Sequence, residues 1–174
     1  MSSENDYNCR DNNKIIASIE KRGLAVIMLD ATDYLPSFAY SIGLWRTFQH
    51  PEIICFGLTT KTLGQLTNDV ADLVRNGHTI EINRDYDNFF EKGRVQFVPV
   101  DKRNLSDYFG TAMDIYDTHD FPALQFVWAD RNDKFPWKKI LQMNSATGNH
   151  CWIGMRALNF GKLRILRYLP QNNG

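Results

Sequence analysis

The sequence lacks the features that mark secreted and membrane proteins. It has only three cysteines, Cys9, Cys55 and Cys151, which form no CxxC pair and no Cys/His cluster. An odd number of widely spaced cysteines argues against a disulfide framework and a zinc site. The chain also has no apolar run of about eighteen residues, and its N-terminus lacks the basic start and apolar core of a secretory signal. We expect a reduced, cytoplasmic protein that does not enter a membrane, with Cys55 as a buried, unreactive thiol in the apolar run IICFG.

The common signatures of catalysis and cofactor binding are missing too. The glycines are dispersed and form neither GxxxxGK nor GxGxxG, so no phosphate-binding loop is predicted. Ser41 lies outside any GxSxG pattern, which argues against a serine hydrolase. His119 with Asp120, and Asp130 with Asp133, have no further carboxylates at ligand spacing, so we interpret both as solvated turns and expect no metal site. No reaction and no cofactor is assigned from these patterns.

Acidic residues are absent from the last part of the chain. From Lys138 to Gly174 there are six Lys or Arg and no Asp or Glu, so all 20 acidic side chains lie within residues 1–137. The formal net charge of zero is therefore the sum of an acidic and a basic segment. Basic side chains beside Tyr168 have the character of a nucleic-acid contact. A shift of the reading frame would produce the same bias without a partner, so we do not expect nucleic-acid binding.

Apolar patterning predicts the secondary structure. Continuous or alternating apolar residues predict strands in LAVIML (24–29), FAYSIGL (38–44), EIICFGL (52–58), TIEI (79–82), VQFVPV (95–100) and ALQFVWAD (123–130). Helical spacing predicts a helix between an Asn12 or Asn13 cap and Gly23, a second over residues 60–76, and a third near residues 105–116. The tract WRTFQHP is predicted to be a loop. Several strands follow one another without a crossover helix, so we predict a single α+β domain with a mixed, largely antiparallel sheet and about three packed helices.

Four motifs follow one another along the chain: FAYSIGL, HPEIICFGL, the predicted helix with LTNDV, and FPALQFVWADRNDKFPW. Together they resemble the bacterial domain-of-unknown-function family 4262, and the resemblance covers residues 14–137. It implies a bacterial, cytoplasmic domain and brings no accepted reaction.

The resemblance stops at Lys138, where members of the family continue with an acidic stretch and a QPLL-like run. Back-translating the tail with allowed codons and restoring one base after Trp137 permits the reading EENFADEFRDWQPLLDRN, in which each shifted codon inherits constrained bases from its neighbours. We therefore predict that the tail is read in a shifted frame; a natural basic extension is the alternative. The predicted organisation is a disordered N-terminus (1–13), the α+β domain (14–137), and a basic, poorly packed tail (138–174).

The nearest approach to an acid–base pair is His50 with Glu52. If Glu52 opens a strand, both side chains point the same way, and the carboxylate can orient the imidazole. The tripeptide HPE also fits a loop in which Pro51 fixes the chain and Glu52 meets water. The candidate pocket built around this pair consists of Tyr40, Arg46, His50, Glu52, Trp128 and Asp130. The alternative reading of Tyr40 and Trp128 is that both are core aromatic residues.

Two functional hypotheses follow. The first is a non-catalytic protein-interaction module, because apolar and aromatic motifs dominate and no nucleophile, base or ligand cluster is evident. The second is a small-molecule-binding domain or enzyme with a pocket around Tyr40, His50 and Glu52. We prefer the first, with a protein as the partner and neither a membrane nor a nucleic acid.

Overall fold

The computed structural model describes residues 4–130 and 132–136 of the chain. Its strands are β1 (Ala25–Leu29), β2 (Phe38–Ile42), β3 (Glu52–Phe56), β4 (Val95–Pro99) and β5 (Ala123–Trp128). Its helices are α1 (Glu4–Arg22), α2 (Leu44–Phe48), α3 (Thr60–Arg75), the 3-10 helix η1 (Lys102–Asn104), α4 (Leu105–Tyr108) and α5 (Gly110–Tyr116). The predictions for the tail, residues 138–174, lie outside the described residues.

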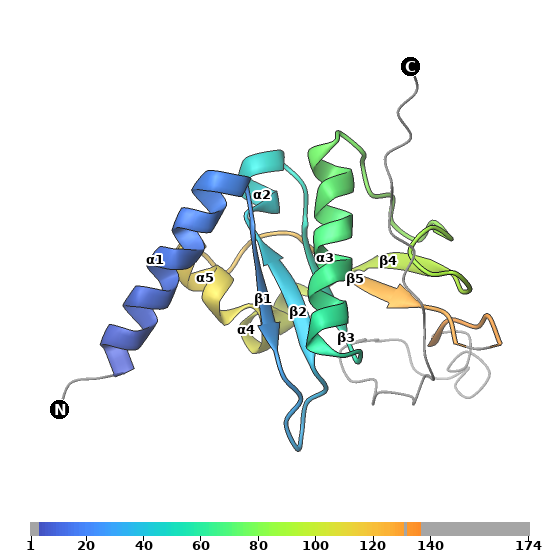
Figure 1. Ribbon diagram of the computed structural model, residues 1–174, viewed down its shortest axis with the longest axis horizontal. Coiled ribbons are helices and arrows are strands. Elements are labelled where there is room, and N and C mark those ends of the chain that lie inside the picture. The colour runs from blue at the N-terminus through green and yellow to red at the C-terminus, as the bar shows by residue number, and fades with distance from the viewer. Residues whose placement is uncertain (1–3, 131, 137–174) are drawn as a thin grey trace.

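The five strands form one sheet in the order β1-β2-β3-β5-β4 (Figure 1). β1, β2 and β3 are antiparallel neighbours, β3 runs parallel to β5, and β4 is antiparallel to β5. The predicted α+β fold with a mixed, largely antiparallel sheet is therefore confirmed, and it forms a single domain. No helix in the described part of the chain has the length and apolar character needed to span a membrane.

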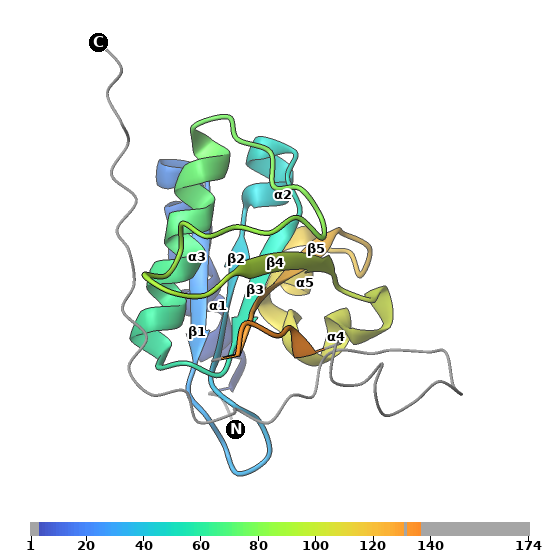
Figure 2. The same ribbon diagram turned by 90° about the vertical axis from the view of Figure 1, so that its right-hand side faces the viewer.

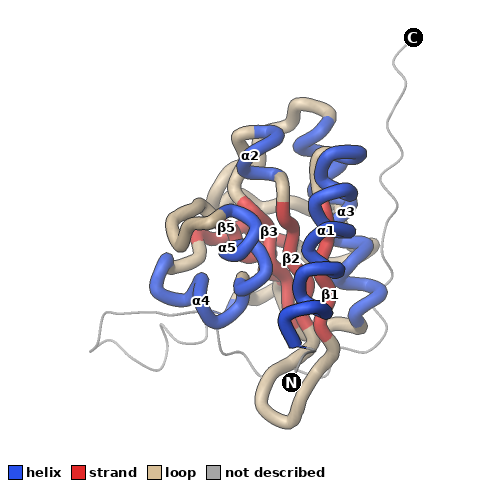
Figure 3. The backbone as a smooth tube through the Cα atoms, turned by 90° about the vertical axis from the view of Figure 1, so that its left-hand side faces the viewer, coloured by secondary structure: helices blue, strands red, loops and turns tan. Residues whose placement is uncertain are grey.

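Helices cover both faces of the sheet and bury two clusters of apolar side chains. Figure 2 shows α3 on one side of the strands and α4 and α5 on the other. The cluster under α3 includes Leu63, Leu66 and Val70, whereas the cluster on the opposite face includes Tyr40 and Phe109. α1 contacts β1 and α5, and its Ile15 and Ile19 pack against the second cluster (Figure 3).

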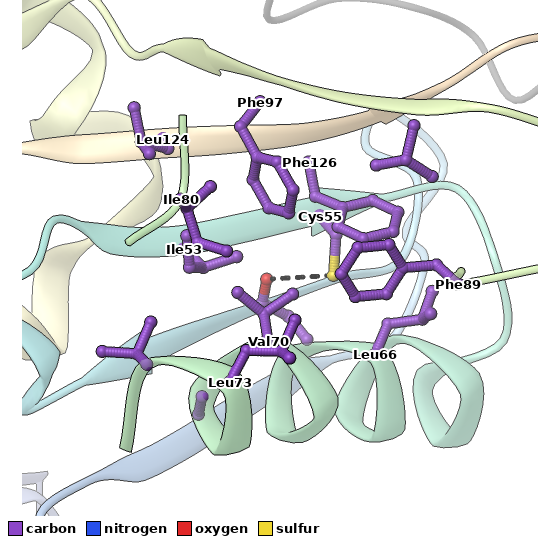
Figure 4. Close-up of a cluster of buried hydrophobic side chains, with 14 of the residues drawn as sticks. Ile53, Cys55, Leu66, Val70, Leu73, Ile80, Phe89, Phe97, Leu124 and Phe126 are labelled. Atoms are coloured by element: carbon purple, nitrogen blue, oxygen red, sulfur yellow. Dashed lines mark hydrogen bonds between the residues drawn. The ribbon is translucent and has the colours of Figure 1, made fainter. Parts of the chain in front are cut away.

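Helix α3 forms where the sequence predicts it. The Thr59 side chain caps the helix by accepting a hydrogen bond from the backbone N–H of Thr62. Figure 4 shows Leu66, Val70 and Leu73 of this helix pointing into the cluster around Cys55. Cys55 is fully buried, with its sulfur 3.3 Å from the Thr67 hydroxyl, and burial raises the pKa of its thiol to about 12. The thiol is therefore protonated at neutral pH, as expected for an unreactive core cysteine.

The first and third predicted helices differ from the structure in their extent. α1 ends at Arg22 as predicted but begins at Glu4, before the expected Asn12 or Asn13 cap, because no proline or glycine interrupts residues 4–22. The helix predicted over residues 105–116 is split into α4 and α5. Phe109 has non-helical backbone angles at the break, and the poor helix former Gly110 follows it.

Two other segments were assigned to the wrong structure. The predicted strand TIEI (79–82) is irregular, because later residues bond to the outer edge of β4 in its place. The Asn83 N–H donates to the Phe97 carbonyl oxygen, and Tyr86 exchanges backbone hydrogen bonds with Val95. The predicted loop WRTFQHP contains most of the short helix α2. No side chain adjacent in the sequence caps the N-terminus of α2, so the residue pattern that usually marks the start of a helix is absent.

Candidate functional site

Glu52 is the most heavily bonded side chain among the candidate residues. It opens β3 and has no exposed surface. Its carboxylate accepts hydrogen bonds from the Ser41 hydroxyl at 2.5 Å and from the backbone N–H groups of Gly43 at 3.0 Å and Trp45 at 2.9 Å. The hydroxyl of Tyr116 donates a further bond to it. This group of residues, which we name the carboxylate lock, connects β2, β3, α2 and α5.

The carboxylate lock explains why α2 begins at Leu44. Glu52 accepts from the N–H groups at the start of the helix, the place that a capping side chain normally takes. Gly43 precedes the helix with a φ of 118°. A Cβ at this position would lie 2.5 Å from the carbonyl oxygen of Gly23, so only glycine fits.

Tyr116, at the end of α5, supplies the fourth donor of the carboxylate lock. Its hydroxyl accepts a hydrogen bond from the Gly43 N–H at 2.6 Å while it donates to Glu52. The Arg46 guanidinium lies 4.7 Å from the centre of the Tyr116 ring and donates to the backbone carbonyl groups of Ile115 and Tyr116. Arg46 is exposed, so the outer end of this arrangement faces solvent.

Burial dominates the electrostatics of the lock. It raises the pKa of Glu52 above its ordinary value, while the hydrogen bonds from Ser41, Trp45, Tyr116 and Gly43 oppose the shift. Burial and the neighbouring carboxylate likewise raise the pKa of the Tyr116 hydroxyl. A carboxylate with no solvent access and four hydrogen-bond donors cannot reach a substrate in this conformation. The geometry therefore gives Glu52 a role in holding elements together.

His50 lies two residues before Glu52 and is also buried. Its Nδ1 donates to the carbonyl oxygen of Pro51 at 2.7 Å, which leaves Nε2 as an acceptor. This Nε2 is buried and has no hydrogen-bond partner within the described residues. Burial lowers the pKa of His50, so the neutral ring is favoured. No hydrogen bond joins the imidazole to Glu52, whose described donors are other groups.

The structure brings some residues of the predicted pocket together and places others apart. Arg46 and Glu52 meet at Tyr116, as described above. Tyr40 is a core residue whose ring centre lies 5.0 Å from that of Phe109, in agreement with the alternative reading.

Trp128 and Asp130 lie at the other end of the sheet. Glu52 is opposite Ala123 in the parallel pair of β3 and β5. Trp128 therefore lies about 16 Å further along β5, at roughly 3.3 Å per residue. Trp128 packs against Phe90 and Phe126, and the Asp130 side chain accepts from the backbone N–H groups of Asn132 and Lys134 in a turn. These two residues therefore have local packing and turn-forming contacts.

Comparison with known proteins gives a family and no activity. Residues 18–142 match the model of the family described as Domain of unknown function (DUF4262). The chain belongs to this family. No curated protein and no solved structure matches it significantly. In this DUF4262 domain, the matched residues include the whole sheet and the carboxylate lock.

The exposed apolar residues of the DUF4262 domain gather at the β1–β2 hairpin. Among the described residues, four of the six exposed large apolar side chains are Met28, Leu29, Tyr34 and Leu35, which we name the hairpin surface. The hairpin projects beyond the end of the sheet in Figures 1, 2 and 3. Sequence reasoning did not identify this surface. The available signal was YLP in a turn, where apolar residues have no local core to enter.

The tip of the hairpin is held in one shape by its own hydrogen bonds. The Thr32 hydroxyl accepts from the backbone N–H groups of Tyr34 at 3.3 Å and Leu35 at 3.1 Å. The Thr32 N–H donates to the Leu35 carbonyl oxygen at 2.8 Å. Tyr34 is 94% exposed and is therefore presented to solvent on an ordered turn. Within the described residues, no group of three or more His, Cys, Asp or Glu side chains is placed to hold a metal ion.

Proposed function

We propose that this domain is a non-catalytic protein-interaction module of the bacterial cytoplasm, which binds a protein through the hairpin surface. The observation that carries the proposal is the exposure of four large apolar side chains on the hairpin, with Met28 and Leu29 at the end of β1 and Tyr34 and Leu35 on the projecting turn. Exposed apolar side chains that gather in one region of a surface often mark a binding site. An ordered turn also loses little conformational freedom when it binds.

The carboxylate lock supports the same proposal. Its Glu52 was the strongest acid–base candidate in the sequence, and its side chain is sealed and occupied by four donors. A general base must reach the proton that it removes. The three widely spaced cysteines fit a reducing compartment.

Site-specific photo-crosslinking tests this function. A photoreactive phenylalanine analogue replaces Tyr34 in the full-length chain, and the control carries it in place of Asp87, an exposed residue between α3 and β4. Irradiation in cells is expected to give a discrete crosslinked product from position 34 and not from position 87. The absence of a discrete product from position 34 would overturn the proposal.

One observation favours the second candidate function, a small-molecule-binding domain. The buried Nε2 of His50 is an acceptor without a partner among the described residues, and a ligand with an N–H or O–H group would satisfy it. A compound that raises the Tm of the wild-type protein and not that of His50→Gln would support this function. A compound that stabilises both equally would act elsewhere.

A further inference from the structure

The two outer strands of the sheet, β4 and β1, differ in how their free edges are bonded. At β4 the outward-facing residues include Val95 and Phe97. Val95 exchanges two backbone hydrogen bonds with Tyr86, and the Phe97 carbonyl oxygen accepts from the Asn83 N–H. By strand alternation the next outward-facing residue is Pro99, which has no N–H. The chain therefore closes this edge itself, as natural sheets commonly do.

The alternation of hydrogen bonds shows which backbone groups of β1 point outward. The Gly57 N–H donates to the Ser37 carbonyl oxygen, so the odd-numbered residues of β2 bond to β3 and its even-numbered residues bond to β1. The odd-numbered residues of β1 lie opposite these even-numbered residues. Val26 and Met28 therefore direct their backbone N–H and C=O groups away from the sheet. We name these two residues the open edge.

Helix α1 reaches only the residues before the open edge. The Leu24 carbonyl oxygen, two positions before Val26, accepts from the Ser18 hydroxyl of α1 at 3.2 Å, which agrees with an outward direction at even-numbered positions. Within the part of the chain that the structure describes, no group bonds to the outward-facing backbone groups of Val26 and Met28. The open edge therefore presents the unpaired ladder of an outer strand.

Apolar side chains lie beside the open edge on both faces of the sheet. Met28 lies on the α3 face, where a Cβ on Gly64 would lie 2.4 Å from its sulfur. Ile27 packs against the cluster on the opposite face, and Leu29 shares that face because it follows at strand spacing. Met28 is 54% exposed and Leu29 is 38% exposed. A strand added here would bury apolar surface on both faces.

We propose that the open edge binds an extended segment of a partner protein, which adds to the sheet as a further strand beside β1. A row of outward N–H and C=O groups is complementary to another extended backbone, and such strand addition gives affinity through main-chain hydrogen bonds. The segment carries apolar side chains at successive positions, because both faces beside the open edge are apolar. A folded second copy could offer only its own β1, since β4 is closed. The inference rests on the proposed interaction function and names the form in which the partner binds.

The open edge and the projecting turn form one continuous region. β1 leads directly into the turn that presents Tyr34, and Figure 1 shows this turn extending from the ends of β1 and β2. A segment that pairs with Val26 and Met28 can continue along the turn and contact the rest of the hairpin surface. A photoreactive residue at position 34 therefore reports on binding at the open edge.

Amide hydrogen exchange in the full-length chain tests the open edge without a partner. The N–H groups of Ile27 and Leu29 bond to β2, whereas that of Met28 points outward. After correction for intrinsic rates, the Met28 amide is expected to exchange at least about a hundredfold faster than either neighbour in NMR measurements. Equal protection of the three amides would show that the chain covers its own edge, and it would overturn the proposal.

Proline at position 28 blocks strand addition and leaves the β1–β2 ladder intact. An outer strand accepts proline where the N–H faces solvent. Met28→Pro is expected to lower the yield of the crosslinked product from position 34 at least about tenfold, because the N–H is lost and the ring occupies the place of the added strand. Met28→Ala loses the same side chain and keeps the N–H, and its yield is expected to stay within about threefold of the wild type. Circular dichroism and the Tm confirm that each variant is folded.

Exchange in the crosslinked wild-type product needs no variant. The product from position 34 is purified, and its Met28 amide is expected to exchange at least about tenfold more slowly than in the free chain. An unchanged Met28 rate would reject strand addition, even if Met28→Pro failed to fold.

The outcomes separate strand addition from the proposed interaction function. A discrete product with another protein, lost in Met28→Pro and kept in Met28→Ala, supports both. A discrete product whose yield is the same in the two variants retains the interaction function and rejects strand addition. A product of twice the 20.2 kDa chain mass would make the occupant a second copy and overturn the assignment to a partner protein. No discrete product from position 34 rejects both.

Discussion

Replacing Glu52 by alanine and by glutamine separates the hydrogen bonds of the carboxylate lock from its charge. In Glu52→Ala, the Ser41 hydroxyl, the Tyr116 hydroxyl and the Trp45 N–H lose their acceptor. The Gly43 N–H keeps the Tyr116 oxygen as a partner. Each buried donor without an acceptor costs about 1–3 kcal/mol. Three such groups give a cost of about 3–9 kcal/mol, and release of the buried carboxylate offsets part of it, so we expect a loss of about 3–5 kcal/mol.

Glu52→Gln is the matched control. The amide oxygen can take the place of the carboxylate oxygen that accepts from Gly43, Trp45 and Tyr116. The amide nitrogen then faces the Ser41 oxygen, which also accepts from the Ile53 N–H and has a second lone pair. The Ser41 hydroxyl then has no acceptor, so we expect Glu52→Gln to cost about 1–3 kcal/mol, less than Glu52→Ala.

Urea unfolding at pH 7, followed by tryptophan fluorescence, measures both variants. A difference of 3–5 kcal/mol is a large share of the roughly 5–15 kcal/mol that stabilises a domain. If Glu52→Ala lost less than about 1 kcal/mol, the buried donors would have found other acceptors and the reasoning would fail. If Glu52→Gln lost as much as Glu52→Ala, the negative charge would be the stabilising feature, against the raised pKa.

Three further predictions concern Glu52, His50 and the basic tail. Because the pKa of Glu52 is raised in the folded state, its contribution to the free energy of unfolding falls as the pH rises above about 4.5, and Glu52→Gln should lack this dependence in urea titrations. Because the pKa of His50 is lowered, stability falls as the pH drops below about 6.5, and His50→Gln should reduce the slope; equal slopes would contradict the burial of a neutral ring. Sequencing the gene across the Trp137 codon is expected to show a missing base relative to related genes, and an intact frame would make the basic tail a natural extension.

The sequence predicts those elements whose signals are local. Thr59 caps α3 from an adjacent position, so the start of the helix can be predicted from the sequence. The apolar residues of the helix recur on one face, so its buried side can be predicted as well. Strands with continuous apolar runs can also be predicted, because the run itself is a local signal. TIEI misled the prediction because four residues of strand composition do not reveal which segment bonds to the edge of β4.

The carboxylate lock escaped prediction because its signals are distant or carried by the backbone. Tyr116 reaches Glu52 across 64 positions, and no spacing rule connects the two. The N–H groups of Gly43 and Trp45 exist in any sequence, so they identify no acceptor. The alternation of side chains along a strand pairs Glu52 with His50 as an acid–base candidate. The same alternation does not distinguish a carboxylate that contacts a substrate from one that caps the start of a helix. Burial, which only the fold supplies, decides between them.

The positions of the lock and the hairpin suggest why one chain carries both. β2 connects them, with Ser41 and Gly43 at the end held by Glu52 and Phe38 at the end that emerges from the hairpin. Binding is tighter when a rigid element positions the surface, because less conformational freedom is lost on binding. The buried bonds fix one end of β2 in the sheet, and the exposed turn at the other end is then presented in a constant direction. Under the proposed interaction function, a carboxylate that looks catalytic in the sequence would support binding from a distance, through the strand that it anchors.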